Sequence, residues 1–165
     1  MMLRPLLIAL TLTSAWPALT GPALAQTTAF GGMRADVSAP VEVAADNLTV
    51  DQTDGSALFS GNVVIGQGEM RLSADEVTVD YAEGGQERIR SLTAIGNVTL
   101  VSGADAAEAQ QAVYDVAGGQ VVLTGEVLLS QGGNVLSGDR MTVDLATGAA
   151  QVQGRVRSVL QPGTP

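Results

Sequence analysis

The fold of this chain is decided by residues 59–81, which read FSGNVVIGQGEMRLSADEVTVDY. Apolar residues recur with period two in this run, and polar or small residues fill most of the alternate positions. This alternation is typical of β-strands with one buried face. The apolar set changes parity between Ala74 and Val77. Because a slip of one residue would turn every later side chain to the wrong face, we expect a bulge or a sharp bend at Asp75.

The pattern of this run recurs along the chain. A glycine opens each copy and a polar residue closes it 14 positions later, in the pairs Gly61/Asp75, Gly96/Gln110 and Gly125/Asp139. An earlier closing residue at Asp46 and a later opening glycine at Gly154 extend the series. The closing positions step by 29, 35 and 29 residues and the opening positions by 35, 29 and 29, so a single six-residue insertion between 82 and 91 explains both long steps. A fixed period of this size predicts stacked units, each of which needs a neighbour to cover its apolar face.

The repeated glycines and polar residues mark the two sides of a predicted corner. Glycine adopts backbone conformations that other residues avoid, and a polar side chain can hydrogen-bond backbone groups freed by a bend. We therefore assign the corner to Gly61, Asp75, Gly96, Gly125, Asp139 and Gly154. The alternation continues to residue 160, and no segment after residue 25 shows a convincing helical stripe. The sequence predicts an all-β fold of bent antiparallel strands, stacked rung on rung.

The chain divides into four parts. Residues 1–25 have an early Arg4, an apolar run and the small-residue ending Ala23–Ala25, which together predict an export signal cleaved after Ala25. Residues 26–40 are rich in Thr, Gly, Ala and Ser, and we expect a flexible arm there. Residues 41–160 form the single repeat domain, and residues 161–165 are expected to be a disordered tail.

The composition disfavours several functions. Removing residues 1–25 leaves seven arginines against 17 acids, a net charge of −10, which disfavours nucleic acid as a partner. The chain has no Lys, His or Cys, so it lacks the commonest general base, the commonest metal ligand and the thiol nucleophile. Neighbouring carboxylates such as Asp75 and Glu76 point to opposite faces of a strand. One carboxylate in each repeat also falls short of the roughly six to eight oxygens that calcium takes. We therefore predict neither an enzyme nor a bound cofactor or metal.

Several short motifs together resemble a known family. They are FSGNV at 59–63 with AD at 74–75, AIGNV at 94–98, and LTG at 123–125 with LSGD at 136–139. Their order and spacing resemble the LptA/OstA-like family of periplasmic lipopolysaccharide transport proteins, over about residues 41–160. The resemblance implies a single open, twisted β-jellyroll of stacked V-shaped antiparallel strands, built here from ~29-residue repeats. It also implies a non-enzymatic periplasmic carrier that binds the acyl chains of lipid A in an apolar groove. Such carriers stack end to end between inner-membrane LptC-like and outer-membrane LptD-like proteins.

The residues expected to face inward supply a continuous aliphatic strip. Such a strip suits hydrocarbon tails, each buried CH₂ contributing ~0.8 kcal/mol. The predicted lipid-binding groove consists of Leu48, Val50, Phe59, Val63, Ile65, Leu72, Val77, Val79, Leu92, Val98, Leu100, Leu123, Val127, Leu129, Met141 and Val143. The same residues could instead fill a closed core, since buried aliphatic residues usually do. The sequence leaves the choice between groove and closed core open.

The two ends of the strand stack are the predicted partner edges. The runs 41–51 and 149–160 contain no proline or lysine, the residues that usually protect an exposed edge strand. We therefore expect Val41, Val43, Val152 and Val156 to lie where partners or further copies add strands head to tail. The alternative interpretation is a secreted structural β-solenoid, a polymer-forming protein with a closed core and no lipid ligand.

Overall fold

The computed structural model describes residues 32–53, 55–84 and 88–161, and these form one antiparallel sheet of ten strands. The predicted signal peptide, residues 26–31 of the predicted arm and residues 162–165 lie outside the described residues. The strands are β1 (Glu42–Ala44), β2 (Asn47–Val50), β3 (Ala57–Gln67), β4 (Met70–Tyr81), β5 (Ile89–Ser102), β6 (Asp105–Asp115), β7 (Gln120–Gln131), β8 (Asn134–Asp144), β9 (Ala150–Gln153) and β10 (Arg157–Val159). The described residues contain no helix, and the predicted all-β jellyroll is confirmed.

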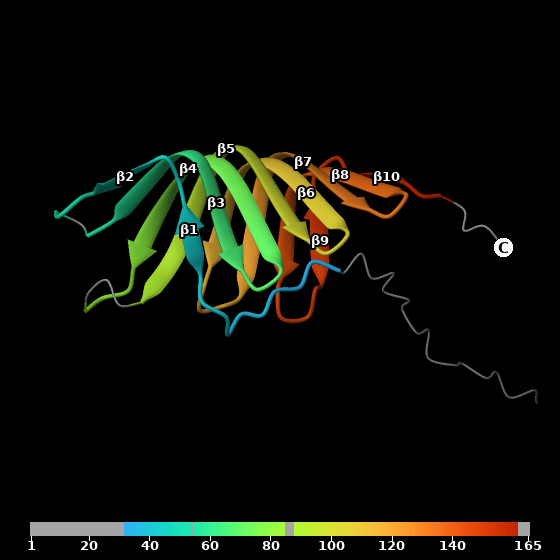
Figure 1. Ribbon diagram of the computed structural model, residues 1–165. Helices are drawn as coiled ribbons and strands as arrows, with labels where there is room; N and C mark the ends of the chain where they lie inside the picture. The colour runs from blue at the N-terminus through green and yellow to red at the C-terminus, as the bar shows by residue number, and fades with distance from the viewer. Residues whose placement is uncertain (1–31, 54, 85–87, 162–165) are drawn as a thin grey trace, which may run out of the picture.

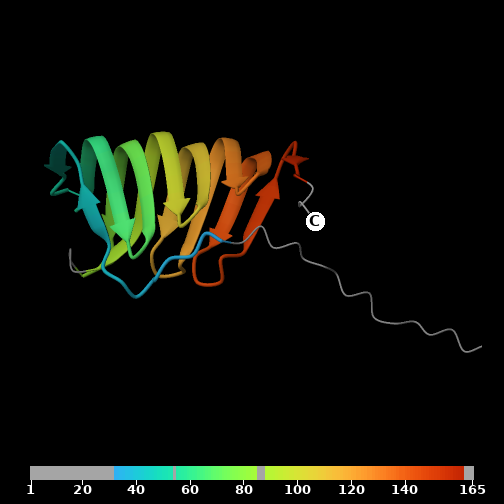
Figure 2. The ribbon, with the colours of Figure 1, turned by 45° about the vertical axis from the view of Figure 1, so that its right-hand side comes forward.

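The sheet is a meander in which sequence neighbours are also spatial neighbours. Strands β3 to β8 are continuous and bent, and each pairs with the next along the chain. At one edge β1 pairs with residues 64–66 of β3 and β2 with residues 57–60, so β1 and β2 form one interrupted strand. At the other edge β9 and β10 divide β8 in the same way. Figures 1 and 2 show the bent strands side by side as an arch with two arms.

Each bend is a register shift at the predicted corner. Between β3 and β4 the pairing passes from Ser60–Glu76 to Val63–Ala74, so that Gly61 and the residue after it face one residue. An extra residue of this kind bends a strand and increases its twist. The shift recurs in every pair of long strands. The opening glycines and the residues that follow them have positive φ, namely Gly61 and Asn62, Gly96 and Asn97, Gly125 and Glu126, and Gly154 and Arg155.

The inner faces of both arms meet in one apolar core. Among the described residues it contains 25 buried apolar residues, from Met33 to Leu145. The outer face retains scattered exposed aliphatic residues such as Leu58, Val64 and Ile95. The alternating burial along each strand follows the period-two pattern of the sequence.

Parts of the predicted flexible arm and of the predicted tail contact the strand ends. Residues 32–40, assigned to a flexible arm, run beneath the lower strand ends as the blue segment of Figures 1 and 2, and Met33 is buried there. Gln161, assigned to the tail, donates its backbone N–H to Asn134 Oδ1 at 3.0 Å. In both cases hydrogen bonds to distant strand ends hold a segment whose local sequence has no regular pattern.

Candidate functional site

The candidate site is the inner face of the bent sheet, where most of the predicted groove residues meet. Thirteen of the sixteen are buried in one cluster, and they are Val63, Ile65, Leu72, Val77, Val79, Leu92, Val98, Leu100, Leu123, Val127, Leu129, Met141 and Val143. Phe59 is half-buried and packs against this cluster. The structure therefore brings together an aliphatic strip that extends from β3 to β8.

Leu48 and Val50 do not belong to this strip. Their side chains are 56% and 45% exposed on β2. Strand β2 pairs only with β3, so it lies at the edge of the sheet, with no further strand to cover it. Period-two alternation identifies a face of a strand but not whether a neighbour covers that face.

The strip is closed by the molecule's own side chains. We call the turns 68–69, 103–104 and 132–133 the first lip, and the turns 116–119 and 145–149 the second lip. They are the opposite ends of the bent strands. Tyr114, next to the second lip, donates its phenolic O–H to Gln67 Oε1 at the first lip, and both side chains are 1% exposed. Because β3 and β6 are not neighbours in the sheet, this hydrogen bond spans the mouth of the V.

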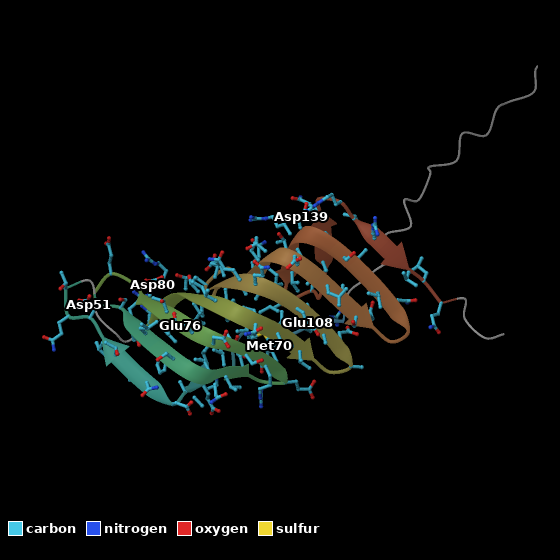
Figure 3. All side chains as sticks on the ribbon, turned by 90° about the horizontal axis from the view of Figure 1, so that it is seen from above. Asp51, Met70, Glu76, Asp80, Glu108 and Asp139 are labelled. Atoms are coloured by element: carbon cyan, nitrogen blue, oxygen red, sulfur yellow. The ribbon has the colours of Figure 1, made fainter. Side chains whose placement is uncertain are left out.

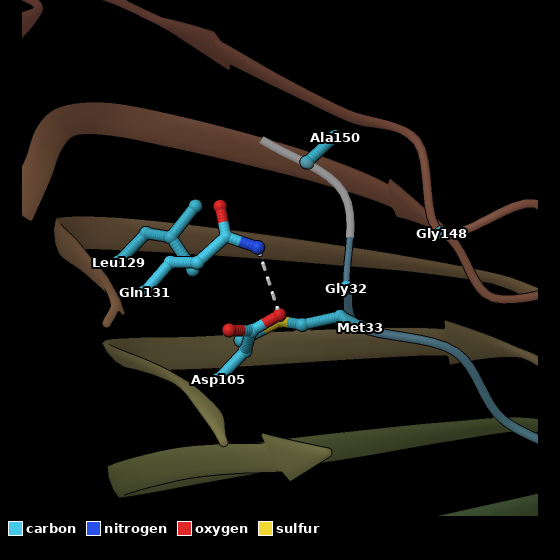
Figure 4. A pocket seen from close by; sticks show the side chains of 7 residues that line it. All are labelled: Gly32, Met33, Asp105, Leu129, Gln131, Gly148 and Ala150. Carbon is cyan, nitrogen blue, oxygen red and sulfur yellow. Dashed lines mark hydrogen bonds between the residues drawn. The ribbon is translucent and has the colours of Figure 1, made fainter. Parts of the chain in front are cut away.

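Residues 32–39, which we call the strap, lie in this mouth between the two lips. On the first lip, Gln67 Nε2 donates to the carbonyls of Val37 at 3.2 Å and Ala39 at 3.0 Å. On the second lip, the Ala35 N–H donates to the Leu145 carbonyl at 3.1 Å. Met33 lines a small cavity of about 10 Å³ between the lips, shown with its neighbours in Figure 4. Sequence reasoning missed the strap because its contacts are made with strand ends far away in the chain.

The predicted corner residues lie together along the bend, in pairs that join one repeat to the next. Asn62 Nδ2 donates to Asp46 Oδ2 and Asn97 Nδ2 to Asp75 Oδ2, both at 2.8 Å. Gln110 Nε2 donates to Glu126 Oε2 at 2.7 Å in the third pair. The closing residue thus bonds to a side chain of the next repeat, which sequence reasoning did not foresee. The available signal was that the residue after each opening glycine is polar.

The fourth corner pair is the ion pair of Arg155 and Asp139. Arg155 Nη2 lies 2.6 Å from Asp139 Oδ1. The hydrogen bond from Arg155 lowers the pKa of the Asp139 carboxyl, and the same bond raises the pKa of Arg155. In the interior, burial raises the pKa of the Tyr114 phenol above its ordinary value, with a smaller opposing effect from the Gln67 hydrogen bond.

The carboxylates are spread along the molecule. Figure 3 looks down on the bent strands, with Asp51, Glu76, Glu108 and Asp139 distributed along their length. Within residues 32–53, 55–84 and 88–161, no three Asp or Glu side chains gather to form a metal site. The same residues include no helix long and apolar enough to cross a membrane.

The predicted partner edges lie at the two ends of the sheet. Val41, Val43 and Val152 are half-buried against the core, whereas Val156 is 51% exposed. Beside Val156, an open concavity of about 790 Å³ is lined by Glu108, Glu126, Val127, Leu128, Ser137, Gly138, Asp139, Arg155 and Arg157. Within the described chain each edge strand pairs on one side only.

These features define a class of protein. Its members are bent, single-sheet β-jellyrolls with a continuous aliphatic lining and two unpaired edges. The sequence profile of the family described as "LptA/(LptD N-terminal domain) LPS transport protein" matches residues 42–149. The chain therefore belongs to this family of lipopolysaccharide transport proteins, and the resemblance found in the sequence motifs is confirmed.

Individual relatives support the assignment. An uncharacterised protein of Rhizobium meliloti is 33% identical over 152 residues, which cover 85% of this chain and 82% of that protein. The lipopolysaccharide export system protein LptA of Escherichia coli K12 is 29% identical over 113 residues, or 65% of this chain and 60% of LptA. The LPS-assembly protein LptD of Salmonella typhimurium is 48% identical over 61 residues, or 36% of this chain and 8% of LptD.

The fold also matches a solved structure. LptH is described as the LptA homologous periplasmic component of the lipopolysaccharide transport device of Pseudomonas aeruginosa. Its crystal structure matches 78% of this chain and 99% of LptH, with a TM-score of 0.68 at 23% identity. This likeness concerns the fold alone.

Proposed function

We propose that this protein is a periplasmic lipopolysaccharide carrier that holds the acyl chains of lipid A against its inner aliphatic strip. The observation that supports the proposal is the strip itself, which extends from β3 to β8 within a family of lipopolysaccharide transport proteins. Aliphatic side chains match acyl chains in polarity, and burial of even part of one chain at ~0.8 kcal/mol per CH₂ supplies useful affinity. The predicted export signal and the naming of LptH as a periplasmic component support the location.

Because the strip is closed in this structure, binding requires the arms or the strap to move. The core holds only small side chains in places, such as Ala94, Ala107 and Ala112, and among the described residues its one aromatic member is Tyr114. Acyl chains would replace contacts between the two arms with contacts to hydrocarbon. Polar head groups would then remain outside, in keeping with the net charge of −10 expected after removal of residues 1–25.

Photo-crosslinking tests the lipid site. A photoreactive residue placed at Val63, Val79 or Val98 should label lipopolysaccharide, whereas one at Thr78, on the outer face of β4, should not. Thermal melting of each variant checks that the fold is kept. Equal labelling at inner and outer positions, or no labelling at any inner position in folded variants, would count against the proposal.

The bridge role is proposed from the two edges. The interrupted strands at both ends have one unpaired side, and strand addition would join β9 and β10 of one copy to β1 and β2 of the next. The same addition would link the ends of a stack to LptC-like and LptD-like proteins. V156D places a charge at an exposed edge position and should shift self-association toward monomer in light scattering. An unchanged distribution would exclude this edge as the contact.

The second candidate is a structural, polymer-forming β-protein without a lipid ligand. The observation that favours it is the closure of the strip by the molecule's own side chains. One measurement distinguishes the two functions. Mass spectrometry of the protein purified from its native cells would detect bound lipopolysaccharide only if the protein is the carrier.

A further inference from the structure

The buried polar side chains of the described residues have a shared location. They are Gln67, Ser102 and Asp105, exposed by 1%, 5% and 7%. All three lie at the first lip and contact the strap. Gln67 donates to two strap carbonyls, Ser102 Oγ donates to the carbonyl of Arg34, and the Asp105 carboxylate lies directly against Gly32. The first lip therefore contacts the strap through polar side chains, whereas the rest of the inner face is aliphatic.

The second lip holds the strap by its backbone. Leu145 accepts from the Ala35 N–H, and Thr147 accepts from Arg34 Nε at 3.0 Å. Val37 lies next to Gly119 of the same lip. The strap thus bridges both lips without being a strand of the sheet.

The apolar anchoring of the strap is small. Met33 is its one fully buried side chain, whereas Arg34, Asp36, Val37 and Ser38 are exposed. Segments with few buried apolar contacts open at lower free energy than the strands they cover. Methionine is also unbranched and flexible, so its side chain fills a space that a hydrocarbon chain can fill. In Figure 4 the Met33 side chain runs beside Asp105, whose Oδ2 accepts the hydrogen bond from Gln131 Nε2, and Leu129 lines the same cavity.

We propose that the strap is a displaceable closure of the acyl-chain site, and that a long-chain amphiphile enters sideways between the lips as the strap leaves and the Tyr114–Gln67 hydrogen bond across the mouth opens. The ligand identity rests on the proposed function, whereas the closure rests on the contacts above. Met33 leaves the aliphatic strip when an acyl chain takes its place. Gln67 and Ser102 then lose their strap carbonyls and can donate to acceptors in the polar part of the amphiphile.

A reversible disulfide between the strap and the first lip tests this proposal. A Cβ at Gly32 would lie 2.9 Å from Asp105 Cγ, so G32C and D105C place two thiols close enough to be joined. The chain has no other cysteine, so oxidation joins only this pair. The control T78C/T93C joins residues that pair between β4 and β5, outside the mouth. Both proteins are tested oxidised and reduced, with purified lipopolysaccharide and with a fluorescent long-chain fatty acid.

The oxidised G32C/D105C protein should bind both probes at least about tenfold more weakly than its reduced form, a difference of about 1.4 kcal/mol. The control should bind equally in both states. Equal binding of both probes by oxidised and reduced G32C/D105C overturns the strap proposal and leaves the lipid carrier intact. A redox effect on the fatty acid without lipopolysaccharide binding by the unsubstituted protein supports the strap and overturns the proposed function. Failure of the unsubstituted protein to bind either probe overturns both.

Hydrogen exchange on the unsubstituted chain gives a second test that needs no disulfide. The Ala35 N–H is protected by its bond to Leu145 in the closed state. Saturating lipopolysaccharide should increase its exchange at least about tenfold, because strap release removes that bond. Retained protection of Ala35 at saturation overturns the proposal. M33S should strengthen fatty-acid binding several-fold by weakening the competing strap, and weaker binding by a folded M33S protein also contradicts it.

Discussion

The corner glycines provide a sharp test of how the bend is built, and Gly96→Ala is the most informative change. Gly96 has φ of +81°, and an added Cβ would overlap the Asp75 carboxylate and lie 3.1 Å from Asp75 Cβ. Gly103→Ala is the matched control, because Gly103 also has positive φ, +60°, yet an added Cβ meets nothing within 4 Å. The pair separates the backbone conformation from the packing of the corner.

The two substitutions should differ in the free energy of unfolding. A side chain in the left-handed region costs roughly 1–2 kcal/mol, which is the whole expectation for Gly103→Ala. Gly96→Ala must also displace Asp75 and disrupt its 2.8 Å hydrogen bond from Asn97, which adds roughly 1–2 kcal/mol of strain and lost bonding. We therefore expect a loss of about 2–4 kcal/mol for Gly96→Ala, or very roughly 3–5 °C in melting temperature per kcal/mol.

Urea denaturation followed by circular dichroism measures both losses, and a double mutant isolates the overlap. In an Asp75→Ala background the carboxylate is absent and only the 3.1 Å approach to the Cβ of residue 75 remains, so Gly96→Ala should cost less than in the Asp75 background, close to the roughly 1–2 kcal/mol expected at Gly103. The reasoning is refuted if Gly96→Ala and Gly103→Ala are equally destabilising, or if the cost of Gly96→Ala is the same with and without the Asp75 side chain.

The other predictions concern the buried hydrogen bond and the exposed ion pair. Tyr114→Phe should lower the free energy of unfolding by about 1–3 kcal/mol, because Gln67 Oε1 would remain buried without its donor; an unchanged urea midpoint would contradict this. Since burial raises the pKa of Tyr114 in the folded state, its contribution is complete below the unfolded pKa of about 10 and is lost as pH rises through the folded value, so alkaline unfolding curves of wild type and Tyr114→Phe should converge. Arg155→Ala should let the pKa of Asp139 rise toward its ordinary value in an NMR titration while stability changes little, because both side chains are exposed; a static Asp139 pKa would refute the stated cause.

The repeat was readable from the sequence because bending is a local property. Each bend needs a glycine at a positive φ, as at Gly61, and it switches the apolar positions from even to odd numbers, as between Ala74 and Val77. Both features recur in the sequence at a fixed spacing. Period-two alternation then assigned most of the buried face correctly, from Val63 to Val143. The method failed at Leu48 and Val50, where exposure depends on the absence of a further strand.

In the corner pairs, the sequence predicted one residue but not its partner. Polar residues at Asp75 and Asp139 were expected at the bend, but their partners Asn97 and Arg155 come from the next repeat. A side chain selects a neighbour across a sheet only after the register between strands is set, and register is a property of the whole stack.

By itself the sequence determined the strand repeat, the bends, the aliphatic face and the family, since each depends on residue type at short spacing. Only the tertiary structure decided that the aliphatic face is closed and that residues 32–39 close it. Those contacts join Gln67, Ser102 and Leu145 to the strap. The strap is far from all three residues in the sequence, and only the fold brings them together. Burial between distant segments depends on where the two arms of each bent strand meet, and no local pattern of residues records that position.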